Sequence, residues 1–394
     1  MKTKPVFYLL VLFCSCTGKV KQDLVSAKTA VANSNQMLAA SLAGAVYDIP
    51  AGTIADHSDP TIPGSIAWYF STYGAGNTYN LSQSAVYPIK NRLIIPVNST
   101  LGATDSTIHP AIQPAALWGS DSIMVLMNND GTTIRDIELN GLFMAKQIVS
   151  GNGHQVSLIH ITAHRSAKVH QGHLIVFSTA KNVLIRDCLL RRAACDTEVH
   201  FPREASLIYT RKCDTVTIKN NDMAIAASAG INFTGSTNVT IAGNEISDAG
   251  RAEIPGYIAD GITAYHTSTG YLYLNVWITS NRIWNCRNNG IHISGRDLHI
   301  ENNKIYSCGL ITDTSYHPNN IRIGDQYAST ASDSTYLNCS SNVTIKNNTI
   351  DNCPGIYHNN TSIYILGPYK TGGVAVSGNT GCTSVFWNTN NTCL

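Results

Sequence analysis

One short motif recurs along the second half of this chain and limits what the chain can fold into. The segments IKNNDM, IAGNEI, ITSNRI, IENNKI and IKNNTI align on one Asn, at Asn221, Asn244, Asn281, Asn303 and Asn348. The intervals are 23, 37, 22 and 45 residues, so the basic unit is about 22 residues and some units carry insertions. A unit of this length with three short strands is typical of one coil of a parallel β-helix, whose coils stack about 4.8 Å apart. Each repetition therefore represents one coil.

The repeated Asn and the composition both favour this architecture. Asn side chains at one turn position can hydrogen-bond along the stacking axis, so the motif predicts an Asn ladder. Only 13% of the residues are charged and 43% are hydrophobic, and the Asn, Ser, Thr and Gly content suits strands and tight turns. The 394 residues exceed one ordinary globular core, but stacked repeats are not subject to that limit.

The charge balance argues against a nucleic-acid partner. The formal net charge is +2, and no run of Lys or Arg interleaved with aromatic residues occurs. We expect a monomer whose partner is a polysaccharide, for the reasons given below.

The N-terminus has the features of an export signal. Lys2 and Lys4 precede an apolar run over residues 6–13 that is too short to span a bilayer. The run ends in LFCSC, which resembles the lipobox of bacterial lipoproteins, with Cys16 as the lipidated residue. An ordinary cleaved signal peptide is the alternative. We expect a location in the cell envelope of a Gram-negative bacterium, with membrane contact only through this lipid.

Three segments follow from these observations. Residues 1–16 form the export signal, residues 17–60 a polar tether and an N-terminal cap, and residues 61–394 the β-helix domain.

The repeats resemble the right-handed parallel β-helix superfamily, which includes pectate lyases, other polysaccharide lyases, several glycoside hydrolases and alginate epimerases. The resemblance covers roughly residues 90–380, and GTTIRDIELNG and HQVSLIHIT look like earlier coils. It implies an all-β fold, a single-stranded right-handed parallel β-helix, and a carbohydrate-active function. No family motif is matched from end to end, and one such scaffold supports many chemistries.

Insertions interrupt the regular coil at two places. Residues 192–205, 248–260 and 310–319 lengthen three coils at the same corner, just before one strand. Residues 267–275 and 325–340 lengthen the connection that follows the same strand. Loops stacked at both edges of one sheet would form the walls of a groove.

The strand between these insertions changes its chemistry. With Ile208, Ile231, Ile262, Ile291 and Ile321 pointing inward, alternation predicts one outward row of Tyr209, Asn232, Thr263, His292 and Arg322. A second outward row contains Arg211, Thr234, Tyr265, Ser294 and Gly324.

This set suits β-elimination on a uronic-acid polymer. Arg322 would pair the uronate carboxylate, His292 would remove the C5 proton as the general base, and Tyr265 would protonate the leaving oxygen. The residues predicted to line the groove are Tyr209, Arg211, Asn232, Tyr257, Asp260 and Thr263. The main prediction is therefore a polysaccharide lyase.

Other interpretations stay open. Outward polar residues on a β-helix are often only solvated, and the groove would also suit a non-catalytic glycan-binding or scaffold protein. In mannuronan epimerases a Tyr-x-x-Asp-Pro-His motif supplies the catalytic groups; YIADGI offers Tyr257 and Asp260 but has Gly261 and Ile262 in place of Pro and His.

Carboxylates offer a further alternative. Loop acids would suit an acid/base glycoside hydrolase, or a Ca²⁺ site as a possible cofactor. The candidates are Glu198, Glu204, Asp248, Glu253, Asp260 and Asp325.

Cys and His residues are interpreted mainly as structural. Cys286, Cys308 and Cys353 each follow a ladder Asn by five residues and are predicted to pack inward, and Cys382 with Cys393 would suit a disulfide at the C-terminal end. The group of His160, His164, His170 and His173 is a weak alternative for a transition-metal site.

Overall fold

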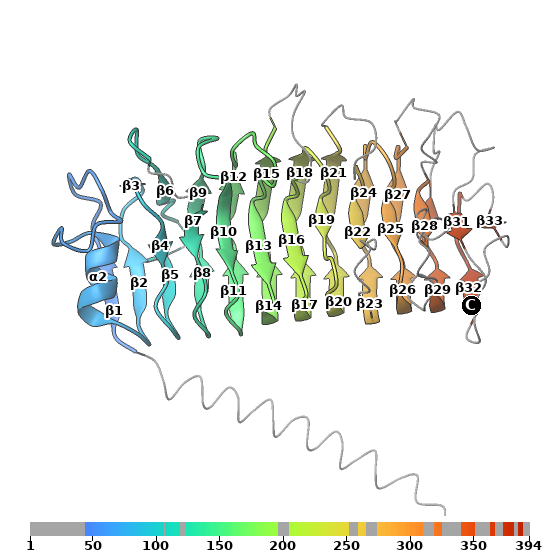
Figure 1. Cartoon of the computed structure of the whole chain (residues 1–394), viewed down its shortest axis with the longest axis horizontal. Coiled ribbons are helices and arrows are strands. Elements are labelled where there is room, and N and C mark those ends of the chain that lie inside the picture. Colours follow the sequence, from blue (N-terminus) through green and yellow to red (C-terminus); the bar gives the residue numbers. More distant parts are fainter. Residues whose placement is uncertain are drawn as a thin grey trace, which may run out of the picture. The chain divides into compact units, whose positions relative to one another are not determined.

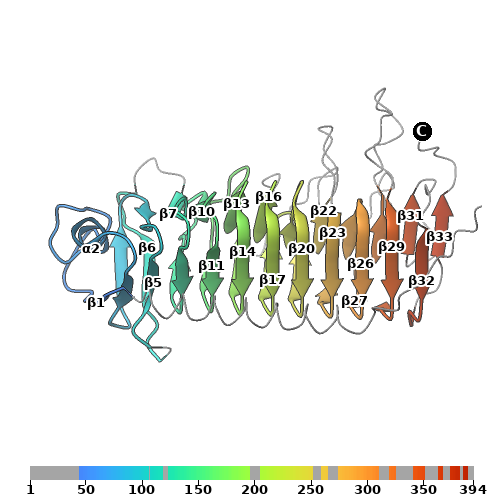
Figure 2. The ribbon, with the colours of Figure 1, turned by 90° about the horizontal axis from the view of Figure 1, so that it is seen from below.

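The computed structural model describes residues 44–105, 107–118, 123–195, 205–251, 259–264, 274–309, 319–324, 340–350, 363–366, 373–381 and 385–388. The unit that begins at Ala45 is a stack of coils, each made of short strands that pair in parallel with the next coil. Figures 1 and 2 show the coils following one another along one axis. This is the predicted parallel β-helix.

Three sheets, here called A, B and C, run the length of the stack. Sheet A consists of β1 (Val46–Ile49), β2 (Thr78–Leu81), β5 (Thr100–Ala103), β8 (Thr133–Arg135), β11 (Val156–Ile159), β14 (Lys181–Arg186), β17 (Asp214–Lys219), β20 (Thr237–Ala242), β23 (Leu274–Thr279), β26 (Arg296–Glu301), β29 (Ser341–Lys346) and β32 (Val374–Ser377).

Sheet B follows sheet A in each coil. It consists of β3 (Val86–Ile89), β6 (Ala111–Pro114), β9 (Glu138–Asn140), β12 (Thr162–His164), β15 (Leu189–Ala193), β18 (Asp222–Ala226), β21 (Glu245–Ala249), β24 (Arg282–Trp284), β27 (Lys304–Tyr306) and β30 (Thr349–Ile350).

Sheet C completes each coil. It consists of β4 (Leu93–Ile94), β7 (Ile123–Leu126), β10 (Gln147–Gly151), β13 (Ile175–Ser178), β16 (Ile208–Arg211), β19 (Ile231–Asn232), β22 (Ile262–Ala264), β25 (Ile291–Ile293), β28 (Ile321–Ile323), β31 (Ile363–Leu366) and β33 (Val385–Asn388).

The core is a column of aliphatic side chains enclosed by the three sheets. In sheet A the inward pair Val239 and Ile241 stacks on Val276 and Ile278, and all four are at most 1% exposed. Period-two alternation sends every second side chain into this column, which explains why the VTI-type strands recur.

The Asn ladder is confirmed. Asn244 Oδ1 accepts hydrogen bonds from the backbone N (3.0 Å) and Nδ2 (2.9 Å) of Asn221. Asn281 Oδ1 accepts the same two bonds from Asn244, each at 2.9 Å. The pattern continues through Asn303 and Asn348 and extends to Asn379. Cys188 takes the ladder place one coil earlier, and its backbone N–H donates to Asn221 Oδ1 at 3.0 Å.

A left-handed residue precedes each ladder position and explains the recurring Asn-Asn pairs. Asn220, Asn302 and Asn347 have φ of 54°, 59° and 56°. Asn, Asp and Gly tolerate this conformation best, and it turns the chain sharply from sheet A into sheet B.

Stacked glycines at the corner before sheet C let the coils close. A Cβ at Gly261 would lie 2.7 Å from the carbonyl oxygen of Gly290 and 2.5 Å from Ile283 Cγ2. No side chain fits there, so the backbone of each coil can approach the next.

Helix α2 (Ile66–Tyr73) lies beside β1 and β2 at the first end of the stack (Figure 1). Ser65 caps its N-terminus by accepting a hydrogen bond from Trp68 N, and Phe70 packs edge-on against Tyr79 at 4.8 Å. The helix thus covers the open end of the core. Strand β1 lies within residues 17–60, the predicted tether and cap, whereas the helix follows residue 60. Sheet A therefore starts before the predicted boundary at residue 60.

The insertions fall at the predicted corners. Residues 192–205, 248–260 and 310–319 fall between a strand of sheet B and the next strand of sheet C, except that 192–193 and 248–249 are the last residues of β15 and β21. Residues 267–275 and 325–340 fall between sheet C and sheet A, except that 274–275 begin β23. Most of these residues are outside the described ranges, so the two walls remain a prediction.

Cys286 and Cys308 pack inward as predicted, with no exposed surface. A hydrogen bond with the Cys308 thiol, followed by burial, raises the pKa of Cys286 well above its usual value. Both residues therefore behave as small core side chains. Cys353, Cys382 and Cys393 lie outside the described residues. Among the residues that are described, no helix is both long and apolar enough to cross a membrane.

Candidate functional site

Sheet C brings the predicted outward row together. Its strands pair so that successive Cα partners are Tyr209, Asn232, Thr263, His292 and Arg322. The alternating residues, such as Ile262 and Ile291, are fully buried in the core. Cα partners on neighbouring parallel strands share one face of the sheet, so the predicted row is confirmed as a geometric unit.

The centre of this row is shielded from water. The exposed fractions are 7% for Asn232, 0% for Thr263, 8% for His292 and 3% for Arg322. Burying polar and charged groups to this extent is unfavourable unless they are hydrogen-bonded or paired. These side chains therefore do not form an ordinary solvated face.

The second outward row supports the first. Thr234 Oγ1 donates to Asn232 Oδ1 at 2.9 Å, which orients the Asn232 amide. Ser294 is buried, whereas Arg211 is exposed at the end of β16.

Asp260 reaches the row from the corner between sheets B and C. Its Oδ2 lies 3.5 Å from His292 Nδ1, and its side chain is 1% exposed. Its Oδ1 accepts hydrogen bonds from the backbone N (2.9 Å) and Nδ2 (2.8 Å) of Asn289. Asn289 Oδ1 in turn accepts from Asn319 N at 2.9 Å. Asp260 is thus the first member of a second, shorter ladder, here called the corner ladder.

The corner ladder does not require a carboxylate at its first position. An Asn in place of Asp260 would keep the oxygen that Asn289 uses, and the preceding coil has Ala229 there, whose side chain offers no acceptor. What the carboxylate adds is a buried negative charge directed at His292.

Both ring nitrogens of His292 face oxygen atoms. Nδ1 faces Asp260, and Nε2 lies 3.1 Å from the carbonyl oxygen of Gly324. Because a carbonyl oxygen can only accept, a hydrogen bond at this position requires a proton on Nε2. To accept a proton as predicted, Nε2 would first have to leave the Gly324 carbonyl.

Two buried oxygens beside His292 are unsatisfied. Within the described ranges, neither Asp260 Oδ2 nor Thr263 Oγ1 has a hydrogen-bond partner, since 3.5 Å to His292 is too long for a good hydrogen bond. Leaving such a group unpaired costs about 1–3 kcal/mol. Groups of this kind are retained where something else completes their hydrogen bonding, such as a ligand.

At the other end of the row, Tyr209 packs against a buried histidine. The Tyr209 ring stacks on His173, with centroids 4.8 Å apart and planes 8° from parallel. His173 Nδ1 accepts a hydrogen bond from Ser206 N at 2.9 Å, and burial lowers the pKa of His173 to about 3. His173 is therefore neutral, and its ring supports Tyr209 by stacking while its Nδ1 holds the backbone at Ser206.

Several sequence-predicted residues lie outside the described ranges. These are Cys16, Tyr257 and Tyr265, together with the acids Glu198, Glu204, Glu253 and Asp325. Of the remaining acids, Asp248 pairs with Arg251 three residues later, and only Asp260 adjoins the row.

The described parts of the chain contain no group of three or more His, Cys, Asp or Glu side chains arranged to hold a metal ion. The proposal of a Ca²⁺ site therefore gains no support from them.

The sequence identified the row but not the corner ladder or the stacking of His173 on Tyr209. The signal was present, because Asp260, Asn289 and Asn319 each stand two residues before an inward Ile of sheet C. Aligning the repeats on those Ile residues as well as on the first ladder would have revealed it.

Comparisons with known proteins agree with this architecture. Residues 97–392 match a family model described as "Right handed beta helix region". No curated protein matches the sequence.

Similar solved structures include a tailspike protein, a polygalacturonase and an epimerase module. The Dettilon tailspike protein is 15% identical, with a TM-score of 0.58 over 87% of this chain and 68% of that one. The polygalacturonase from Erwinia carotovora ssp. carotovora is 11% identical, with a TM-score of 0.56 over 89% and 96%. The A-module of a mannuronan C-5 epimerase from Azotobacter vinelandii is 14% identical, with a TM-score of 0.52 over 87% and 98%. At these identities the likeness concerns the fold alone.

Proposed function

This chain belongs to the right-handed β-helix family, and we propose that it is an exported enzyme that cleaves a uronic-acid-containing polysaccharide by β-elimination on the outer face of sheet C. The observation that carries the proposal is the buried constellation around His292. It combines an acidic group, an imidazole and a guanidinium, and two oxygens in it, Asp260 Oδ2 and Thr263 Oγ1, are unsatisfied.

The residues have distinct roles in this proposal. Arg322 pairs the uronate carboxylate through its planar fork, which makes the C5 proton more acidic. In the reacting complex the His292 ring turns Nε2 away from the Gly324 carbonyl, and the deprotonated Nε2 takes that proton. The electron pair of the C5–H bond forms the C4–C5 double bond, and the C4–O bond breaks. Tyr265 gives a proton to the leaving oxygen. Asp260 holds the imidazole through Nδ1 and stabilises its protonated form.

Thr263 and Asn232 would bind sugar hydroxyls. The unsatisfied Thr263 Oγ1 adjoins His292 on the neighbouring strand, and Asn232 lies one coil further along. The small exposed fractions of Asn232 and His292 mark where a sugar chain would reach the row.

The substrate class has an independent, weaker support. Two of the similar structures carry names that refer to galacturonan and mannuronan, and a long sheet face beside stacked insertions suits a polymer. The N-terminal segment with Cys16 supports the proposal that the enzyme acts in the cell envelope, held there by a lipid.

The test is to incubate the protein with a panel of uronate polymers and follow both the ultraviolet absorbance of unsaturated products and the number of new reducing ends. Absorbance that is lost in His292→Gln and Arg322→Lys, but kept in the exposed control Arg186→Lys on sheet A, is the expected result. New reducing ends without absorbance would overturn elimination in favour of a carboxylate hydrolase. No turnover with glycan still retained would overturn the enzyme in favour of a binding protein.

A further inference from the structure

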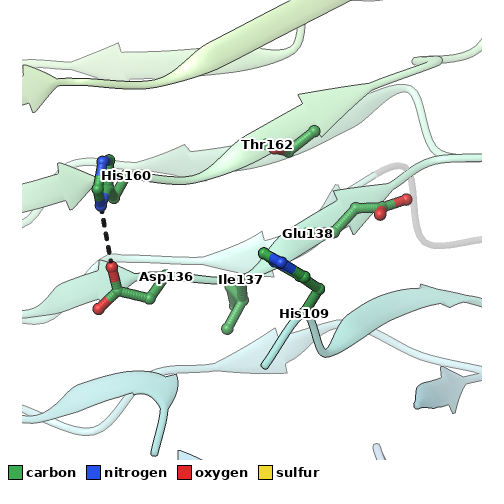
Figure 3. Close-up of a pocket in the computed structure, with 6 residues that line it drawn as sticks. All are labelled: His109, Asp136, Ile137, Glu138, His160 and Thr162. Atoms are coloured by element: carbon green, nitrogen blue, oxygen red, sulfur yellow. Dashed lines mark ion pairs between the residues drawn. The ribbon is translucent and has the colours of Figure 1, made fainter. Parts of the chain in front are cut away.

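A separate pocket lies on the connections from sheet A to sheet B, in the early coils. It has a volume of about 270 Å³ and is lined by His109, Asp136, Ile137, Glu138, His160 and Thr162. Figure 3 shows the central coil, which carries Asp136, Ile137 and Glu138, with His109 on one side and His160 and Thr162 on the other. Three successive coils therefore contribute to it.

Each carboxylate in this pocket is paired with an imidazole. Asp136 Oδ1 lies 3.3 Å from His160 Nδ1, and Asp136 Oδ2 lies 2.6 Å from the guanidinium of Arg135. Glu138 Oε1 lies 2.8 Å from Nε2 of His164. The carboxylates are thereby held in place, as a preformed site requires.

The two carboxylates differ in charge balance. Asp136 is paired with a permanent cation, Arg135, whereas Glu138 is hydrogen-bonded to a histidine and also experiences the positive charge of Arg165. The hydrogen bond from His164 lowers the pKa of Glu138, so this group stays ionised and acts only as an acceptor. An anionic ligand would therefore be repelled by Glu138.

The remaining features suit hydroxyl groups on a ring. The Glu138 side chain is 35% exposed, so its carboxylate can accept hydrogen bonds from the hydroxyl groups of a ligand. Thr162, its partner on the next strand, offers a hydroxyl beside it. Ile137 also lines the pocket but is only 3% exposed, because its side chain packs in the core. The volume is below the roughly 300–1,000 Å³ of pockets for drug-sized ligands, so it matches one sugar unit rather than a chain.

We propose that this pocket is a binding subsite for a single neutral sugar unit, recognised through Glu138 and Thr162. Strand β11 belongs to the pocket, and β23 belongs to the coil that carries His292. These two coils are four steps apart along the stack, which is about 20 Å at about 4.8 Å a coil. The subsite is thus separate from the row on sheet C and does not depend on the cleavage proposed there. It would anchor a neutral residue or side branch of a glycan.

The test uses the full-length protein and a panel of neutral monosaccharides with the matching uronic acids. Binding is followed by NMR, through the imidazole signals assigned to His109, His160 and His164. We expect at least one neutral sugar to shift these signals and its uronic acid to bind at least tenfold more weakly. Glu138→Gln should weaken the neutral sugar about tenfold or more, since a hydrogen bond to a charged group contributes about 1.5–3 kcal/mol.

Glu245→Gln is the matched control. Glu245 occupies the same outward column of sheet B as Glu138, but it lies three coils beyond Thr162 and outside the pocket. The Glu245→Gln variant should bind the neutral sugar with unchanged affinity.

Three results would overturn the subsite: no neutral sugar shifts the imidazole signals, Glu138→Gln binds as tightly as the unmodified protein, or a uronic acid binds equally well. The uronate cleavage assay reports on sheet C alone. Failure of the subsite and failure of the proposed lyase are therefore distinguishable.

Discussion

Asp260 Oδ2 and His292 Nδ1 lie 3.5 Å apart on neighbouring coils, both in side chains that are almost fully buried. The same Asp260 side chain is held from the other side by Asn289, at 2.9 and 2.8 Å. Asp260 therefore links a structural ladder to the most polar part of sheet C. Its two oxygens have separable tasks, which makes its role open to test.

Asp260→Asn should separate those tasks. The amide oxygen preserves the bonds from Asn289, so the free energy of unfolding should change by less than about 1 kcal/mol. The lost charge should lower kcat on the uronate substrate at least tenfold, because His292 is no longer stabilised in its protonated form. Thermal unfolding and initial rates measure the two effects.

The matched control is Asn289→Ala, which breaks the corner ladder. It leaves Asn319 N without its acceptor and should cost about 1–3 kcal/mol of stability. If Asp260→Asn instead destabilised the fold as strongly as this control and left kcat unchanged, Asp260 would be structural only.

Removing one rung of the main ladder should be costly. Asn281→Ala leaves the backbone N and Nδ2 of Asn244 without an acceptor, and the carbonyl of Ile241 without its donor at 2.9 Å. We expect a loss of about 3 kcal/mol, measured by urea unfolding. Lys304→Ala, at an exposed position of β27, should change stability by less than about 0.5 kcal/mol. Equal effects of the two variants would contradict a stabilising ladder.

Burial of His173 predicts a loss of stability in acid. Its pKa in the folded protein is about 3, below the ordinary value of 6.5. Below pH 6.5 His173 binds a proton in the unfolded chain but not in the folded chain. The free energy of unfolding is therefore unaffected by protonation of His173 above pH 6.5 and decreases as the pH falls towards 3. By pH 4.5 the decline should be about 2–3 kcal/mol.

The measurement is urea unfolding at pH 7 and pH 4.5 for the unmodified protein and for His173→Asn. The Asn oxygen can accept the bond from Ser206 N without titrating. The variant should therefore lose less stability between the two pH values. An identical loss in both proteins would mean that another group causes the acid sensitivity.

The buried thiols should resist alkylation. A thiol reacts as the thiolate, and Cys286 has both a strongly raised pKa and no exposed surface. We expect iodoacetamide to leave Cys286 and Cys308 unmodified in the native protein and to label both in urea, as read by mass spectrometry. Rapid labelling in the native state would show that this part of the core opens.

The coils, the first ladder, the inward Ile columns and the outward row of sheet C could all be predicted from the amino-acid sequence. Each of these follows from a short pattern that repeats once per coil, and stacking copies one coil's geometry onto the next. That is why the row of Asn232, Thr263, His292 and Arg322 could be written down from strand alternation alone.

The side chains that meet around that row and in the early coils could be identified only from the folded chain. Asp260 reaches His292 across 32 residues, Glu138 reaches His164 across 26, and His173 stacks on Tyr209 across 36. Such contacts depend on how insertions of unequal length place one turn beside the next, and no local pattern encodes that distance. Burial has the same origin, because alternation predicts that His292 and Arg322 point away from the core but cannot predict that they are nevertheless shielded from water.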